Sequence, residues 1–266
     1  MISNMGFRND ERGISEVLAF IFVFAIIITS VGVLYSVGFS SMNDYQENEQ
    51  LRNAERAMEA LGDNFDDIHR HAGVGQRHGE LSLRQGTVVV DDESTQMNVT
   101  AGSEGPIFED ENASFVDGDN VTLGTFEYRT GSDWIAYQGS GLFRGDDSGS
   151  AVLEVPPIRK TDEGTLVVSM VAIESDGRSL QSGEMTGFTA TDTDERVAVT
   201  DSSLDDENVT ITIHPEPGYE TGWVRALERA GAETEPEFDE TDGTIEAEFT
   251  DIDAYTVNVV GIEIDF

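Results

Sequence analysis

The chain has 266 residues and no cysteine, which excludes a disulfide framework, a thiolate catalyst and a cysteine-based metal site. Its 53 acidic residues against 15 basic ones give a formal net charge of -38, and Lys160 is the one lysine. A charge of this sign repels nucleic acid, so no nucleic-acid partner is expected. Mutual repulsion among so many negative charges destabilises a compact domain. Concentrated salt shortens the Debye length to about 3 Å and screens this repulsion, so the composition indicates a halophilic protein. An acidic disordered chain is the alternative, but β-branched and aromatic residues recur in periodic runs that favour folding.

The first element in chain order is an apolar run at residues 17–39, 23 residues without a charge. As a helix this run is about 35 Å long, which is enough to span a bilayer. Arg8 and Arg12 precede it and acidic residues dominate after it. The positive-inside rule therefore predicts a cell-membrane protein with one span, a cytoplasmic N-terminus and an extracellular remainder. A secretory signal cleaved near residues 36–38 is the alternative, although the run exceeds the roughly 7 to 15 apolar residues of such signals.

Residues 43–70 continue the helical pattern as an amphipathic segment. Apolar residues spaced by three or four positions form one stripe of a helix. These are Leu51, Ala54, Met58, Leu61, Phe65 and Ile68. We predict one long helix over residues 14–72 that stops near Gly73. The stripe packs either on the protein's own β domain or in an intermolecular coiled coil.

A short motif stands directly before the apolar run, and it reads Glu11-Arg12-Gly13-Ile14-Ser15-Glu16. It resembles the class III signal of archaeal type IV pilins and archaellins. That resemblance implies cleavage between Gly13 and Ile14 by a membrane-embedded prepilin peptidase, with residues 1–13 as the leader. It also implies other pilin-like subunits as partners.

Glu16 follows the implied cleavage point. Its carboxylate is favoured by the dipole of the helix N-terminus. In a filament it would neutralise the new amino terminus of a neighbouring subunit, and in the alternative reading it is simply solvated at the headgroup level. Many haloarchaeal pilins have proline at this position, so the resemblance concerns the export route rather than filament membership. A long helix followed by an acidic β-rich domain is also similar to uncharacterised haloarchaeal pilin-like envelope proteins.

The remaining residues, 75–266, change to a period of two, which predicts strands separated by Gly, Asp, Asn and Ser turns. We expect an α+β protein in which the long helix is followed by one mainly antiparallel β domain, a sandwich or an open barrel. One short helix is expected at residues 218–231, where Trp223, Leu227 and Ala230 share a face. The expected strands are residues 86–91, 96–101, 120–129, 134–138, 150–155, 165–174, 188–191, 196–200, 208–214, 244–250 and 255–265.

Four Asn-x-Ser/Thr acceptors lie in this domain, as expected of an exported glycoprotein. They are Asn98, Asn112, Asn120 and Asn208. A chain rich in Asn, Ser and Thr also produces such triplets by chance.

Sequence patterns of catalysis are weak. Of the four histidines, His69, His71, His78 and His214, the first two are two positions apart on a helix and point to different faces, so we expect a solvated helix end rather than a metal site. Residues 145–150 only faintly resemble a serine-protease nucleophile loop, and the acidic clusters at 117–120 and 192–195 lack the register of an EF-hand loop.

The sequence therefore predicts no catalytic, cofactor-binding or metal residues. It favours a membrane-anchored, pilin-like surface protein that is not an enzyme and acts in adhesion or as a minor pilus subunit. The alternative is a permanently single-pass envelope protein whose β domain binds a ligand or partner. An exported hydrolase is the least favoured reading.

Overall fold

The computed structural model describes residues 11–71, 73–82, 86–102, 105–109, 111–175, 179–182, 185–204, 207–233 and 235–266. By its internal contacts the chain divides into two compact units, residues 1–52 and residues 53–266. The boundary falls inside the first helix, so residues 53–70 belong to the same unit as the strands. Most of the expected leader, residues 1–10, lies outside the described residues.

The helix α1 (Glu11–Arg70) contains 60 residues. Its sequence has no proline, and the spaced apolar residues of its second half supply the buried face that a helix of this length requires. Gly73, at φ +103°, takes the left-handed conformation just after the helix ends, which glycine adopts at low cost. The expectation of one long N-terminal helix is confirmed.

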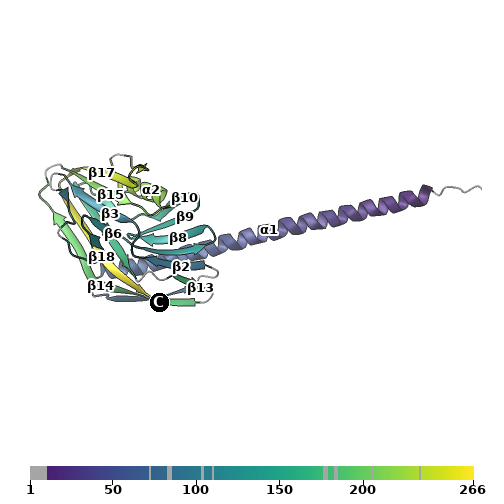
Figure 1. The fold of residues 1–266 in the computed structure, drawn as a ribbon, viewed down its shortest axis with the longest axis horizontal. Coiled ribbons are helices and arrows are strands. Elements are labelled where there is room, and N and C mark those ends of the chain that lie inside the picture. The colour runs from purple at the N-terminus through teal and green to yellow at the C-terminus, as the bar shows by residue number, and fades with distance from the viewer. Residues whose placement is uncertain are drawn as a thin grey trace, which may run out of the picture. The chain divides into compact units, whose positions relative to one another are not determined.

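The strands of the second unit form three sheets (Figure 1). The first sheet has the order β1 (Gln76–Ser82), β14 (Met185–Asp201), β18 (Ala254–Asp265), β12 (Thr165–Glu174) and β11 (Ile158–Lys160). The second sheet has the order β10 (Gly149–Glu154), β9 (Gly141–Asp146), β8 (Asp133–Gln138), β7 (Thr125–Thr130), β2 (Gly86–Asp91) and β13 (Ser179–Ser182). The third sheet has the order β16 (Phe238–Asp239), β17 (Thr244–Ile252), β15 (Glu207–His214), β3 (Gln96–Ala101), β6 (Asn120–Thr122) and β5 (Val116–Asp117), and β4 (Gly105–Pro106) pairs with β3.

Among the strands that the structure describes, pairing is antiparallel except between β12 and β18, which run parallel from Thr165 opposite Ala254 to Glu174 opposite Glu263. Both strands first alternate and then have four consecutive buried residues, at positions 170–173 and 259–262, as expected where a strand is covered on two faces. The predicted class, α+β with a mainly antiparallel β domain, is confirmed.

Two expected strand boundaries were wrong. The single strand expected at residues 120–129 is two strands, β6 and β7, which belong to different sheets. Gly124 separates them at φ +60°, where a Cβ would lie 2.1 Å from the carbonyl oxygen of Ile173. Conversely, the two strands expected at residues 188–191 and 196–200 are one strand, β14, whose register on β18 shifts between Asp192 and Arg196.

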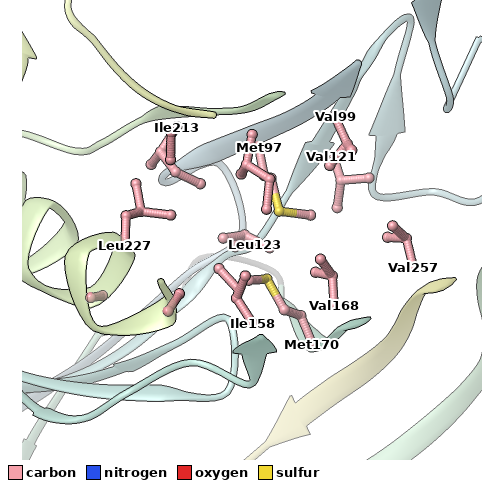
Figure 2. Close-up of a cluster of buried hydrophobic side chains, with 14 of the residues drawn as sticks. Met97, Val99, Val121, Leu123, Ile158, Val168, Met170, Ile213, Leu227 and Val257 are labelled. Carbon is pink, nitrogen blue, oxygen red and sulfur yellow. The ribbon is translucent and has the colours of Figure 1, made fainter. Parts of the chain in front are cut away.

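The core lies where the sheets meet the helix α2 (Glu220–Ala230), which ends at Gly231 in the left-handed conformation. The expected helical face is buried, including Trp223, Leu227 and Ala230. Figure 2 shows Leu227 of α2 on one side of the cluster and Val257 of β18 on the other, with Met97, Leu123 and Met170 between them. Apolar side chains from all three sheets therefore share one core with this helix.

Candidate functional site

The apolar segment Ser15–Gly38 of α1 is the one helical segment, among the residues described, that is long and apolar enough to cross a membrane. It contains 24 residues, about 36 Å of helix. Its large apolar side chains are exposed, for example Phe20 at 70 % and Leu34 at 73 %. Such a surface is unfavourable in water, so the segment is suited by length and composition to a single membrane span or a signal anchor.

The residues of the expected processing motif lie at the start of this helix. Arg12, Gly13 and Ile14 are helical, but their side chains are outside the described part of the structure. The Glu16 side chain is exposed. The structure therefore positions the motif on α1 directly before the apolar segment.

The stripe on the second half of α1 is buried. Leu51, at the end of the first unit, is 5 % exposed, and the five residues of the second unit are at most 2 % exposed: Ala54, Met58, Leu61, Phe65 and Ile68. The Phe65 ring lies 6.0 Å from that of Phe126, 5.1 Å from that of Tyr137 and 6.1 Å from that of Phe188. The stripe in the second unit therefore packs on the chain's own first and second sheets.

Close approach of α1 to β8 depends on Gly62. A Cβ at this position would lie 3.1 Å from the Tyr137 ring, tighter than an ordinary contact. The Tyr137 hydroxyl donates to Asp66 Oδ1 at 2.9 Å, and Arg70 donates to Asp66 Oδ2 at 2.7 Å. Burial, and then the Asp66 charge, raises the pKa of Tyr137 well above its ordinary value. Asp66 thus ties the helix to the sheet through a neutral phenol.

His69, one turn beyond Phe65, is half-buried and not solvated, which corrects the expectation for the helix end. Its Nε2 and the Ser169 Oγ are 2.5 Å apart, whereas Nδ1 is buried and has no hydrogen-bond partner in the described structure. Burial lowers the pKa of His69, and so do Arg70 and Arg196, against the opposing effects of Asp66 and Asp192. His71 is exposed, as expected, and lies 3.6 Å from Asp67.

Charges on the flanks of the stripe are unbalanced. Glu55 pairs with Arg144 at 3.8 Å, and Asp67 pairs with Arg77 at 3.1 Å. Partial desolvation raises the pKa of Glu154 on β10, and the carboxylates of Glu59, Asp63 and Asp66 raise it further. Like charges therefore meet across one side of the docked helix.

The four glycosylation candidates occupy different environments. Asn112 and Asn208 are exposed, whereas Asn98 and Asn120 are half-buried. The amide nitrogen of Asn98 donates to the Asp119 carbonyl at 2.6 Å, and that of Asn208 donates to Glu248 Oε1 at 2.7 Å. Asn98, Asn120 and Asn208 lie on strands of the third sheet, and Asn112 lies outside the strands.

Acidic motifs seen in the sequence form turns. Asp146, in the stretch 145–150, accepts hydrogen bonds from the backbone and hydroxyl of Ser148 in the turn between β9 and β10. Residues 117–120 form the turn between β5 and β6, and residues 192–195 form the bulge of β14. Within the described ranges, no group of three or more His, Asp or Glu side chains is arranged to hold a metal ion.

The sequence did not indicate a buried polar network that lies beside the core. The Glu127 carboxylate, on β7, accepts bonds from Arg129 Nε at 2.8 Å and from the Tyr219 hydroxyl at 2.8 Å. Nearby, Trp223 Nε1 donates to the buried Gln138 at 2.7 Å. These bonds join β7 to Tyr219, the residue before α2, and join β8 to Trp223 within α2, so the buried polar groups named here are paired. Strand periodicity alone carries no signal of it.

These features define an α+β protein with one exposed apolar helical segment and a β-rich unit in which residues 53–70 of the same helix pack on the sheets. The chain belongs to a family of unknown function (DUF7289), whose model matches residues 12–265 and so includes both α1 and the three sheets. No curated protein and no solved structure matches the chain.

Proposed function

We propose that this chain is a membrane-anchored, pilin-like surface protein, possessing no enzymatic activity and presenting its β-rich unit outside the cell. The observation that carries the proposal is the exposed apolar segment Ser15–Gly38, directly preceded by Arg12-Gly13-Ile14. A segment of this length in one helix favours insertion into a bilayer. The cytoplasmic N-terminus is inferred from Arg8 and Arg12 before it.

The two parts of α1 differ in exposure, and this difference supports the same proposal. The apolar part is exposed, while the amphipathic part from Ala54 to Ile68 packs on the sheets. A leader cut on the cytoplasmic side would leave this whole helix on the mature protein. Lateral association of such helices with other pilin-like subunits would then build a surface assembly of adhesive or minor-pilin type.

The mature N-terminus tests the proposal. Mass spectrometry of the protein purified from membranes of its own host is expected to give a chain that begins at Ile14. Gly13→Val should block cleavage, and Gly6→Val, which lies in the leader away from the cut, should not. A chain beginning near Phe39 would overturn both the anchor and the assembly helix.

The second candidate is a permanent single-pass envelope protein whose β-rich unit binds a ligand or partner. It is favoured by the absence of proline at Glu16, since proline is common there in haloarchaeal pilins. An uncleaved chain in the membrane fraction, starting upstream of Gly13, would select this candidate over the first.

A further inference from the structure

We propose that Asn112 is the acceptor of an N-linked glycan and that the sequon at Asn98 stays unmodified in the folded protein. The inference rests on the proposed export of the β-rich unit, because the modification needs an enzyme and a donor outside the cytoplasm. The sequence alone does not distinguish the four sequons from one another. The environments of the four acceptor nitrogens separate them.

The chemistry of N-glycosylation sets the requirements for the acceptor asparagine. The side-chain amide nitrogen forms a bond to the anomeric carbon of a lipid-linked oligosaccharide phosphate donor, and the anomeric carbon–oxygen bond breaks. The lipid phosphate leaves with the electron pair of that bond, and the amide gives up one proton. The nitrogen must therefore be reachable and not committed to another acceptor, and the attached sugar needs open space around it.

Asn98 fails both requirements. It lies on β3, which pairs with β15 on one side and with β6 on the other. Its Nδ2 donates to the Asp119 carbonyl at 2.6 Å, and its Oδ1 accepts from the hydroxyl of Thr100, the third residue of its own sequon, at 3.0 Å. A glycan on Nδ2 would have to find space beside the Asp119 carbonyl, on a half-buried face of the third sheet.

Asn112 meets both requirements. It lies in residues 111–115, directly before β5, where its side chain is exposed. Within the described structure this side chain makes no hydrogen bond. Phe108 and Phe115, which are 0 % and 6 % exposed, anchor the segment in the core on either side. The buried anchors hold the backbone while the amide points to solvent, so a glycan is added without loss of packing.

The remaining two sequons, at Asn120 and Asn208, lie between Asn98 and Asn112 in how accessible and uncommitted their side-chain amides are. Asn120 is half-buried and pairs with Asp117 in the hairpin of β5 and β6. Asn208 is exposed, but its amide nitrogen donates to Glu248 on the adjacent strand β17 at 2.7 Å.

Ser114, the hydroxyl residue of the Asn112 sequon, donates to Glu174 at 2.5 Å on the exposed surface, where water readily replaces such a bond.

Glycopeptide mass spectrometry tests the inference on the full chain expressed in its own host and recovered from membranes. The wild-type protein is expected to carry a glycan at Asn112. Asn112→Gln and Ser114→Ala should each remove that mass, whereas Ser114→Thr, which preserves the sequon, should retain it. Asn98→Gln should leave the total glycan mass unchanged.

Two results would overturn the assignment: a glycan at Asn98, or an unmodified Asn112 in protein that is found in the membrane. The membrane fraction keeps this failure separate from that of the proposed function. If the protein is absent from membranes and carries no glycan, the proposed export itself is contradicted.

Discussion

His69 of α1 and Ser169 of β12 are joined by a hydrogen bond of 2.5 Å across 100 positions of sequence, while the other ring nitrogen of His69 is buried without a partner in the described structure. A neutral imidazole fits this position. A protonated one would place an unpaired N–H in the interface between the helix and the sheet.

Acid is therefore expected to weaken the docking of α1 through His69. Because the folded-state pKa of His69 is lowered, its contribution to the free energy of unfolding is complete above about pH 6.5 and is lost as the pH falls through the folded-state pKa. Glu154 and Glu216 have raised pKa values and act in the opposite direction, since their penalty disappears on protonation. The difference between wild type and His69→Gln isolates the histidine.

Urea unfolding of the full chain between neutral and mildly acidic pH measures that difference. The fluorescence of the two buried tryptophans, Trp134 and Trp223, reports on the β-rich unit. The wild-type protein should lose more stability on acidification than the variant does. Parallel pH profiles for the two proteins would refute the role of His69.

Phe65→Ala should lower the free energy of unfolding of the β-rich unit by about 3 to 5 kcal/mol. The ring is fully buried and packs against Phe126, Tyr137 and Phe188, so its removal leaves a cavity. Phe22→Ala in the exposed apolar segment deletes the same side chain and is the matched control, with an expected change below about 0.5 kcal/mol. Urea unfolding in detergent measures both, and equal losses would contradict the packing of the stripe.

Glu154→Gln should stabilise the protein at low salt, because it removes a carboxylate that Glu59, Asp63 and Asp66 repel. The side chain is largely solvated, so the expected gain is about 0.5 kcal/mol or less at about 0.2 M NaCl and vanishes near 2 M NaCl. Asp147→Asn, at an exposed turn, changes the net charge equally and controls for overall repulsion. An equal gain from both variants would mean that the local cluster is unimportant.

Gly124→Ala should be far more damaging than Gly131→Ala. Both glycines have positive φ, +60° and +61°, but a Cβ at Gly124 would meet the Ile173 backbone, whereas at Gly131 nothing lies within 4 Å. The backbone strain costs about 1 kcal/mol at either site, and the clash raises the loss at Gly124 to about 3 kcal/mol or more. Thermal unfolding compares the two, and similar midpoints would argue against the close approach of Gly124 to Ile173 of β12.

Local sequence patterns were sufficient to predict the long helix, its apolar first part and the spacing of the stripe that ends at Ile68. These are local periodic signals, in which each residue is read against neighbours three or four positions away. Most strands were also predictable from their period of two, and the short helix at Glu220–Ala230 from its apolar face. The glycosylation sequons were visible as triplets, but not their environments.

The folded structure was needed to show which strands share a sheet, that residues 120–129 are split between two sheets at Gly124, and that Phe65 packs against rings from β7, β8 and β14. It alone decided that His69 is half-buried and that Asn98 is engaged while Asn112 is exposed. Strand pairing and the burial of polar groups depend on residues far apart in the chain, such as His69 and Ser169. Local periodicity does not predict which distant residues become partners.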